Sequence, residues 1–224
     1  MIISAIEESA RLAGSLGDAV RAAGPRAGWL CDLDGTVVDS MALHHRAYAM
    51  LFAELGGTLS RADFDAHVGP PARVTVPLFA QAAGLDPAAL PDFAQLHARK
   101  KHFLQDILAS SRPTELATAG LIRQAPADIA IAIVTSGNRD GAENILRSIS
   151  LRERITALIS GDDVTHGKPD PEPYATACHA MGLAPSACLA FEDHPDGIAS
   201  AIAAGVDVID VVAGRLLLAG QGAR

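Results

Sequence analysis

The chain has 224 residues, of which 49% are hydrophobic and 20% are charged, and its formal net charge at pH 7 is −8. This length allows a buried core, either as one large domain or as a domain with a small insertion. The negative charge argues against nucleic acid and anionic membranes as the main partner, because both attract a basic protein surface.

The three cysteines, Cys31, Cys178 and Cys188, form no CxxC pair. An odd number of such thiols is typical of a reducing compartment, and indicates neither disulfides nor a zinc site. No apolar run approaches the roughly 18 residues of a membrane span, and the N-terminal segment lacks the pattern of a signal peptide. We expect a cytoplasmic protein, a monomer or weak dimer, with no membrane partner.

The chain opens with a helical pattern. Apolar residues recur at helical spacing from Ile2 to Val20. The Gly24-Pro25 pair ends this pattern, because proline lacks the backbone donor that a helix needs. We predict an N-terminal helix within residues 1–26, ahead of the main domain.

Five short apolar runs follow and are predicted to be buried strands. They cover residues 28–33, 129–135, 155–160, 187–191 and 206–211. Their nearly continuous Val, Ile, Leu and Ala character is typical of parallel strands that are covered on both faces.

Helical patterns separate the later strands, at residues 140–150, 173–182 and 196–205. The last two end at glycine, as many helices do. Asp196 is the residue expected to cap the last of them. Alternating strands and helices predict a doubly wound α/β domain with right-handed crossovers.

The first and second strands are separated by nearly a hundred residues with helical patterns and no clear strand. Because a bare loop of that length is implausible in a compact domain, we predict an inserted all-helical module. We assign residues 41–114 to this module, and residues 27–40 and 115–224 to the α/β core.

The residues predicted at the carboxyl ends of the strands are unusually rich in polar groups. In open parallel sheets, ligands bind at this edge. The first strand is followed there by Asp32 and Asp34, and the second by Thr135-Ser136-Gly137-Asn138. The third precedes "GKPDPEPY", which contains Lys168, and the fourth runs into "FEDHPDG".

These groups suit phosphoryl transfer through a covalent step. Asp32 could attack phosphorus as a carboxylate nucleophile. Mg²⁺ held by Asp32 and Asp193 would cancel the repulsion between carboxylate and phosphate. Lys168 would neutralise a phosphate oxygen together with the nucleophile, and Asp34 would protonate the leaving oxygen and then activate water.

The phosphate itself needs donors. The Thr135 hydroxyl and the amides of Ser136, Gly137 and Asn138 would bind the remaining phosphate oxygens. Gly35 would let the chain turn sharply after the two aspartates.

The stretches "DLDGTVVDS", "VTSGN", "GKPDPEPY" and "FEDHPDGI", in this order, resemble the four signature motifs of the haloacid dehalogenase-like (HAD) hydrolase superfamily. The resemblance covers residues 29–211. A helical module directly after the first motif is similar to the C1-cap group of that superfamily. This group includes phosphoglycolate phosphatase, sugar and sugar-alcohol phosphatases, and β-phosphoglucomutase.

The resemblance implies the same roles for Asp32, Asp34, Thr135 and Lys168. It adds Glu192 beside Asp193 in the metal shell, and the backbone carbonyl of Asp34 as a further Mg²⁺ ligand. It also implies a substrate that leaves through oxygen, because the dehalogenases of the superfamily lack an acid at the position of Asp34.

The inserted helical module, which corresponds to the cap of that group, also contains candidate residues. His44 lies just beyond the first motif, where related enzymes often have a histidine facing the cleft. Arg73 and the pair Lys100/Lys101 could reach a substrate phosphate or hydroxyl. For each of these residues, and for His45, an ordinary place on a helix surface is the alternative.

We therefore predict a Mg²⁺-dependent phosphomonoester hydrolase that acts on a small phosphorylated metabolite, namely a sugar or sugar-alcohol phosphate, through an aspartyl phosphate. A β-phosphoglucomutase-like phosphotransferase would use the same residues. A non-catalytic phosphate-binding or receiver-like module is the third possibility, although receivers lack both the cap insertion and an acid in the role of Asp34.

Overall fold

The computed structural model describes residues 15–67 and 72–220 of the chain. The chain forms two compact units, of which one comprises Met1–Asp39 and Pro113–Arg224 and the other Ser40–Arg112. We call the first the core unit and the second the helical unit, and describe each by itself.

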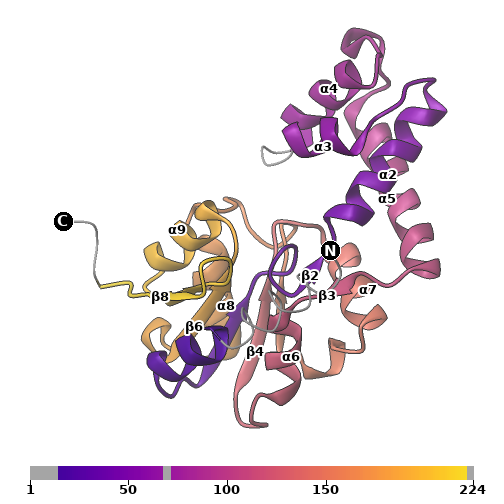
Figure 1. The fold of residues 1–224 in the computed structure, drawn as a ribbon. Coiled ribbons are helices and arrows are strands. Elements are labelled where there is room, and N and C mark those ends of the chain that lie inside the picture. Colours follow the sequence, from indigo (N-terminus) through magenta and orange to yellow (C-terminus); the bar gives the residue numbers. More distant parts are fainter. Residues whose placement is uncertain (1–14, 68–71, 221–224) are drawn as a thin grey trace. The chain divides into compact units, whose positions relative to one another are not determined.

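The core unit is built on a six-stranded sheet with the strand order β5-β4-β1-β6-β7-β8 (Figure 1). The strands are β1 (Gly28–Cys31), β4 (Ala130–Val134), β5 (Ala157–Ile159), β6 (Cys188–Glu192), β7 (Asp207–Asp210) and β8 (Arg215–Leu217). The first five pair in parallel, whereas β8 runs antiparallel to β7. This confirms the predicted doubly wound α/β fold, with β1 in the middle of the sheet.

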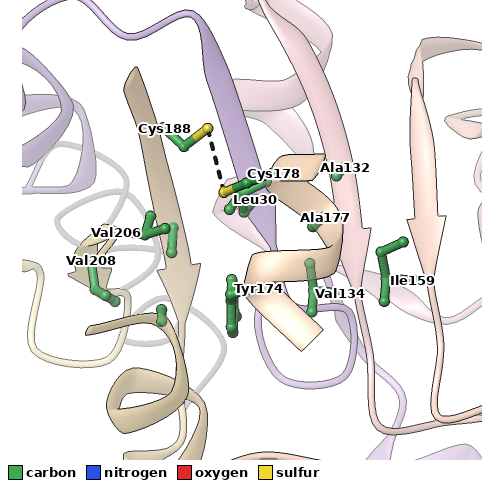
Figure 2. Close-up of a cluster of buried hydrophobic side chains, with 12 residues drawn as sticks. Leu30, Ala132, Val134, Ile159, Tyr174, Ala177, Cys178, Cys188, Val206 and Val208 are labelled. Carbon is green, nitrogen blue, oxygen red and sulfur yellow. Dashed lines mark hydrogen bonds between the residues drawn. The ribbon is translucent and has the colours of Figure 1, made fainter. Parts of the chain in front are cut away.

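Both faces of the sheet are buried, as the nearly continuous apolar strands predict. One face carries a cluster of twelve buried residues, most of which are labelled in Figure 2. It joins Leu30 of β1 to side chains of α8 (Glu172–Met181) and α9 (Pro195–Ala203). On the opposite face, the rings of Trp29 and Phe191 lie 5.2 Å apart between centroids.

Three short strands were not predicted from the sequence. One is β8, a strand of three residues of which the first is an arginine. The other two, β2 (Val38–Asp39) and β3 (Thr114–Glu115), pair with each other in a two-stranded ribbon. β3 contradicts the expectation of no strand between the first two long ones. Two residues are too few to show a period of two, so only the pairing with β2 defines this strand.

The helices of the core unit lie close to their predicted positions. α7 spans Arg139–Ser148, and α6 (Ala117–Gln124) returns the chain from the helical unit. Gly182 ends α8 in the left-handed conformation, with φ of 67°, as predicted. The expected cap at Asp196 is wrong: His194 caps α9, and its Nδ1 accepts a hydrogen bond from the Asp196 amide at 3.2 Å.

The N-terminal helix is seen from residue 15 to residue 23, with Leu16 and Ala19 buried. The earlier part of its predicted range, residues 1–14, lies outside the described residues. The segment after the helix is fixed to the sheet, because Arg26 makes a salt bridge of 2.7 Å with Asp207 of β7.

All regular elements in the described residues of the helical unit are helices, as expected. They are α2 (Met41–Glu54), α3 (Arg61–His67), α4 (Ala72–Ala82), the 3₁₀ turn Pro87–Ala89 and α5 (Phe93–Ser110). Aromatic rings of α2, α3 and α4 form its centre: the ring centroids of Tyr48 and Phe64 each lie 5.1 Å from that of Phe79.

None of the helices in residues 15–67 and 72–220 is both long enough and apolar enough to cross a membrane.

Leu30→Ala should destabilise the core unit strongly. Leu30 is fully buried on the central strand, and truncating such a leucine leaves a cavity that costs about 3 kcal/mol. Leu218→Ala is the matched control, since Leu218 is 40% exposed and should lose less than about 1 kcal/mol. Urea denaturation of both variants measures the difference, and equal losses would contradict the packing described above.

Candidate active site

The site lies in the core unit, at the carboxyl ends of β1, β4 and β6. Asp32 directly follows β1, and its backbone amide donates a hydrogen bond of 3.0 Å to the carbonyl of Phe191 in β6. Its side chain is buried. The neighbouring strand β6 ends at Glu192, so the parallel pairing of β1 and β6 brings these two acids to the same edge.

Lys168 connects the acids. Its Nζ donates to Asp32 Oδ1 at 2.6 Å, to Glu192 Oε1 at 2.5 Å and to the Val134 carbonyl at 2.9 Å. The ammonium group therefore has three oxygen acceptors, each at the carboxyl end of a different strand. The side chain is only 8% exposed, so that these contacts are screened little by water.

A third carboxylate completes the cluster. One carboxylate oxygen from each of Asp32, Glu192 and Asp193 lies within 4.8 Å of the others. Asp193 Oδ1 also accepts a hydrogen bond of 3.0 Å from the hydroxyl of Thr36. Three carboxylates around one ammonium group leave an excess of negative charge, and a set of carboxylate oxygens suits a hard cation such as Mg²⁺.

Burial and charge shift the pKa values of this cluster. Loss of solvation raises the pKa of Asp32 well above its ordinary value; the Lys168 ammonium opposes this shift, and the charges of Glu192 and Asp34 add to it. Burial likewise raises the pKa of Asp193, helped by the charge of Glu192. The pKa of Lys168 is raised, because the charges of Asp32 and Glu192 outweigh the opposing effect of burial.

Asp34 and Thr135 lie together beside this cluster. The Thr135 hydroxyl donates to Asp34 Oδ2 at 3.4 Å and accepts a hydrogen bond of 3.0 Å from the Gly137 amide. The chain turns at Gly35, directly after Asp34, and the φ angle of this glycine is 98°. A Cβ at this glycine would overlap the carboxylate of Asp193, so the turn also makes room for that side chain.

The three residues that follow Thr135 in the loop after β4 differ in their environment. Ser136 and Gly137 are exposed. The side chain of Asn138 caps α7, because its Oδ1 accepts a hydrogen bond of 2.9 Å from the Gly141 amide. Because this oxygen is engaged in the cap, binding of a phosphate by the backbone amide of Asn138 stays a prediction.

The candidate residues of the cap lie in the helical unit. Lys100 is 9% exposed, and its Nζ lies 2.8 Å from Nδ1 of His44 and 5.1 Å from the centroid of the Tyr48 ring. The guanidinium of Arg73 stacks on Phe93 at 4.4 Å. Lys100 is buried and is therefore not an ordinary solvated surface charge, whereas Arg73 is exposed and stacks on an aromatic ring. Their binding of substrate stays a prediction.

His45 has a structural environment instead. Its Nε2 lies 3.2 Å from the carbonyl of Leu59, and its ring lies 5.5 Å from the ring of Phe64. These contacts place it within the packing of the helical unit.

Three residues of the site escaped the sequence analysis. Thr36 is fully buried and binds Asp193, and Tyr174 is fully buried and donates a short hydrogen bond to Glu192 Oε1. Gly197, in the first turn of α9, leaves the space that the Glu192 carboxyl group occupies. All three lie inside the motifs quoted above. The sequence alone did not indicate their roles, because the importance of a threonine or tyrosine hydroxyl, or of a glycine, depends on which residue it contacts in the fold.

Comparison with known proteins gives consistent matches over most of the chain. Residues 29–211 match the family model of the haloacid dehalogenase-like hydrolases. Validoxylamine A 7'-phosphate phosphatase of Streptomyces hygroscopicus subsp. limoneus is 32% identical over 190 residues, which cover 79% of this chain and 81% of that protein. Fructose-1-phosphate phosphatase of Escherichia coli is 28% identical, with 83% and 96% covered.

Among solved structures, CbbY from Rhodobacter sphaeroides in complex with phosphate is similar, with a TM-score of 0.72 and 27% identity. The superposition covers 82% of this chain and 84% of that one. The family match over residues 29–211 includes the segments that carry the site.

Asp32→Asn should stabilise the protein in the absence of divalent cations. A carboxyl group whose pKa is higher in the folded than in the unfolded chain costs folding free energy when it is ionised, so a neutral amide relieves this cost. We therefore expect a higher melting temperature than that of the wild type in EDTA. Asp128→Asn, at an exposed turn, is the control and should change nothing. A lower melting temperature for Asp32→Asn would show that the pairing with Lys168 outweighs the cost of burial.

Proposed function

This chain belongs to the haloacid dehalogenase-like hydrolases, and we propose that within this family it is a Mg²⁺-dependent phosphatase of small sugar or sugar-alcohol phosphates. The proposed reaction transfers the phosphoryl group first to Asp32 and then to water.

The observation that carries this proposal is the position of Lys168 between Asp32 and Glu192. A carboxylate can attack a phosphate dianion only when the repulsion between the two is reduced. The ammonium group, at 2.6 Å from Asp32 Oδ1, is already in place to do this. A structural ion pair would need only one carboxylate, whereas this cluster holds three.

The side chains of Asp32, Asp193 and Glu192 would hold the Mg²⁺ ion, together with the backbone carbonyl of Asp34. Their oxygens fit a hard cation, which also offsets the surplus negative charge of the cluster. When bound, the ion would supply positive charge to the nucleophile and to the phosphate oxygens.

In the first step, an oxygen of Asp32 forms a bond to phosphorus while the bond from phosphorus to the substrate oxygen breaks. Asp34 gives its proton to that leaving oxygen, so the substrate departs as a neutral alcohol. Lys168 balances the charge of the transferring group, and the Thr135 hydroxyl and the amides that follow it bind the remaining phosphate oxygens.

In the second step, Asp34 takes a proton from a water molecule, whose oxygen attacks phosphorus. The bond between phosphorus and the Asp32 oxygen then breaks, which releases inorganic phosphate and restores the carboxylate. Asp34 is protonated again at the end and is ready for the next turnover. The carboxyl group therefore acts once as acid and once as base.

The relatives and the helical unit support the proposed substrate class. The two relatives are named as phosphatases of validoxylamine A 7'-phosphate and of fructose 1-phosphate. Lys100 and His44 form a pair of nitrogen groups that suits hydroxyl or phosphate oxygens, and Arg73 adds a second cation. We propose that these three residues bind the polar part of the substrate.

The principal test is Mg²⁺-dependent phosphate release from a panel of phosphorylated metabolites, ranked by kcat/KM. Asp32→Asn should lower turnover at least about 10⁴-fold, because the amide cannot form the covalent intermediate. Asp128→Asn should match the wild type. Undiminished turnover by the Asp32 variant would overturn the mechanism, and no turnover by the wild type on any member of the panel would favour a non-catalytic phosphate-binding module.

Asp34→Asn should separate the two steps. Nitrophenolate leaves without a proton, so p-nitrophenyl phosphate should still phosphorylate Asp32 in this variant, while attack by water loses its base. Rapid mixing should then show a burst of about one equivalent of nitrophenolate, with Asp32 phosphorylated, followed by slow turnover. An alkyl phosphate should give no burst. Wild-type behaviour with both substrates would remove Asp34 from the acid–base role.

The phosphotransferase alternative differs in what leaves the enzyme. A β-phosphoglucomutase-like protein returns the phosphoryl group to a sugar, so β-glucose 1-phosphate would yield an isomer instead of free phosphate. We expect phosphate as the main product, and ³¹P NMR of the reaction mixture distinguishes the two products directly.

A further inference from the structure

We propose that Tyr174 and Gly197 are positioning residues which hold the Glu192 carboxylate in one orientation, so that Glu192 fixes Lys168 and keeps an oxygen for the metal ion. This inference rests on the proposed function insofar as it concerns a Mg²⁺ site. Lys168, Tyr174, Glu192 and Gly197 all belong to the core unit.

Two donors hold the Glu192 carboxylate. Lys168 Nζ and the Tyr174 hydroxyl both donate to the same oxygen, Oε1. The side chain is only 1% exposed, so water cannot replace either donor. With both donors on Oε1, the other oxygen is not needed for these contacts and can serve as a ligand.

Within residues 15–67 and 72–220, the Tyr174 hydroxyl donates its hydrogen bond to Glu192 Oε1. Its ring belongs to the apolar cluster between α8 and the sheet, where it is fully buried (Figure 2). A phenylalanine would fill this space equally well, whereas a buried hydroxyl must find a partner. The partner here is a carboxylate beside Lys168, whose Nζ lies 5.4 Å from the centre of the Tyr174 ring.

Gly197 leaves the space in which the Glu192 carboxyl group lies. A Cβ on this residue would overlap the carboxyl carbon and both oxygens of Glu192. The carboxylate cannot swing away without breaking its bonds to Lys168 and Tyr174, because it is enclosed. The position of Gly197 in the first turn of α9 is therefore required by Glu192, although alanine is the better helix former.

Metal affinity is the first test. Tyr174→Phe keeps the packing and removes only the hydroxyl, and groups that orient metal ligands typically change affinity about 10–100-fold. We expect Mn²⁺, titrated into the EDTA-treated full chain and followed by electron paramagnetic resonance, to bind about tenfold more weakly. Tyr48→Phe is the matched control at the only other tyrosine, and should bind Mn²⁺ as the wild type does.

Gly197→Ala should weaken Mn²⁺ binding at least as much as Tyr174→Phe, because it displaces the carboxylate. Gly120→Ala is the control in another core helix, where a Cβ would meet no atom within 4 Å. This control should leave Mn²⁺ binding unchanged and the melting temperature equal or higher.

Double-mutant cycles in EDTA separate positioning from general damage, because they need neither metal nor turnover. In the wild-type background, Tyr174→Phe and Gly197→Ala should each lower the melting temperature by about 2–4 °C. In a Glu192→Ala background, the hydroxyl has lost its acceptor and the added methyl group meets empty space. Both substitutions should then leave the melting temperature unchanged or raise it.

The outcomes distinguish this inference from the proposed function. Equal losses in both backgrounds, wild-type affinity for Mn²⁺ in Tyr174→Phe, or a wild-type chain that does not bind Mn²⁺ would overturn the positioning role. The positioning role is supported if the two substitutions lower the melting temperature only when Glu192 is present and also weaken Mn²⁺ binding. This result would stand even if the protein hydrolysed no phosphate ester, and then only the proposed reaction would be wrong.

Discussion

The site depends on one buried ammonium group that is shared between two carboxylates. Lys168 binds Asp32 after β1, Glu192 at the end of β6 and the carbonyl of Val134 at the end of β4. A carboxylate buried without a partner would be protonated or would destabilise the fold, so these acids can be ionised only near a cation. The order of the strands matters for this reason: β1 lies between β4 and β6, and the three acceptors meet at one point.

The same cluster of charges lowers the folding stability of the protein. Lys168 offers one positive charge to three carboxylates, and burial raises the pKa of both Asp32 and Asp193. A chain selected for stability alone would replace some of these acids by neutral groups. Their retention is understandable if a cation and a phosphate ester complete the balance of charge, as in the proposed reaction.

Sequence reasoning was most successful where a single residue type carries the signal. Asp32, Lys168 and Asp193 could be assigned to one edge because strand ends of a parallel sheet converge there, and the five parallel strands were visible as continuous apolar runs. β3 has only two residues and β8 begins with an arginine, so neither lies in such a run. Thr36, Tyr174 and Gly197 were missed because their importance depends on contact with an acid elsewhere; Thr36, for example, lies 157 positions from its partner Asp193.

The short outer strands of the sheet also determine how the protein behaves at high concentration. At one edge, β5 has three residues, and the Arg139 guanidinium donates to its Leu158 carbonyl at 2.9 Å. At the other edge, β8 begins with Arg215, which pairs with Asp210. Short, charged edges prevent strand addition between molecules. The sheet thus combines a strongly hydrophobic interior with borders that resist aggregation.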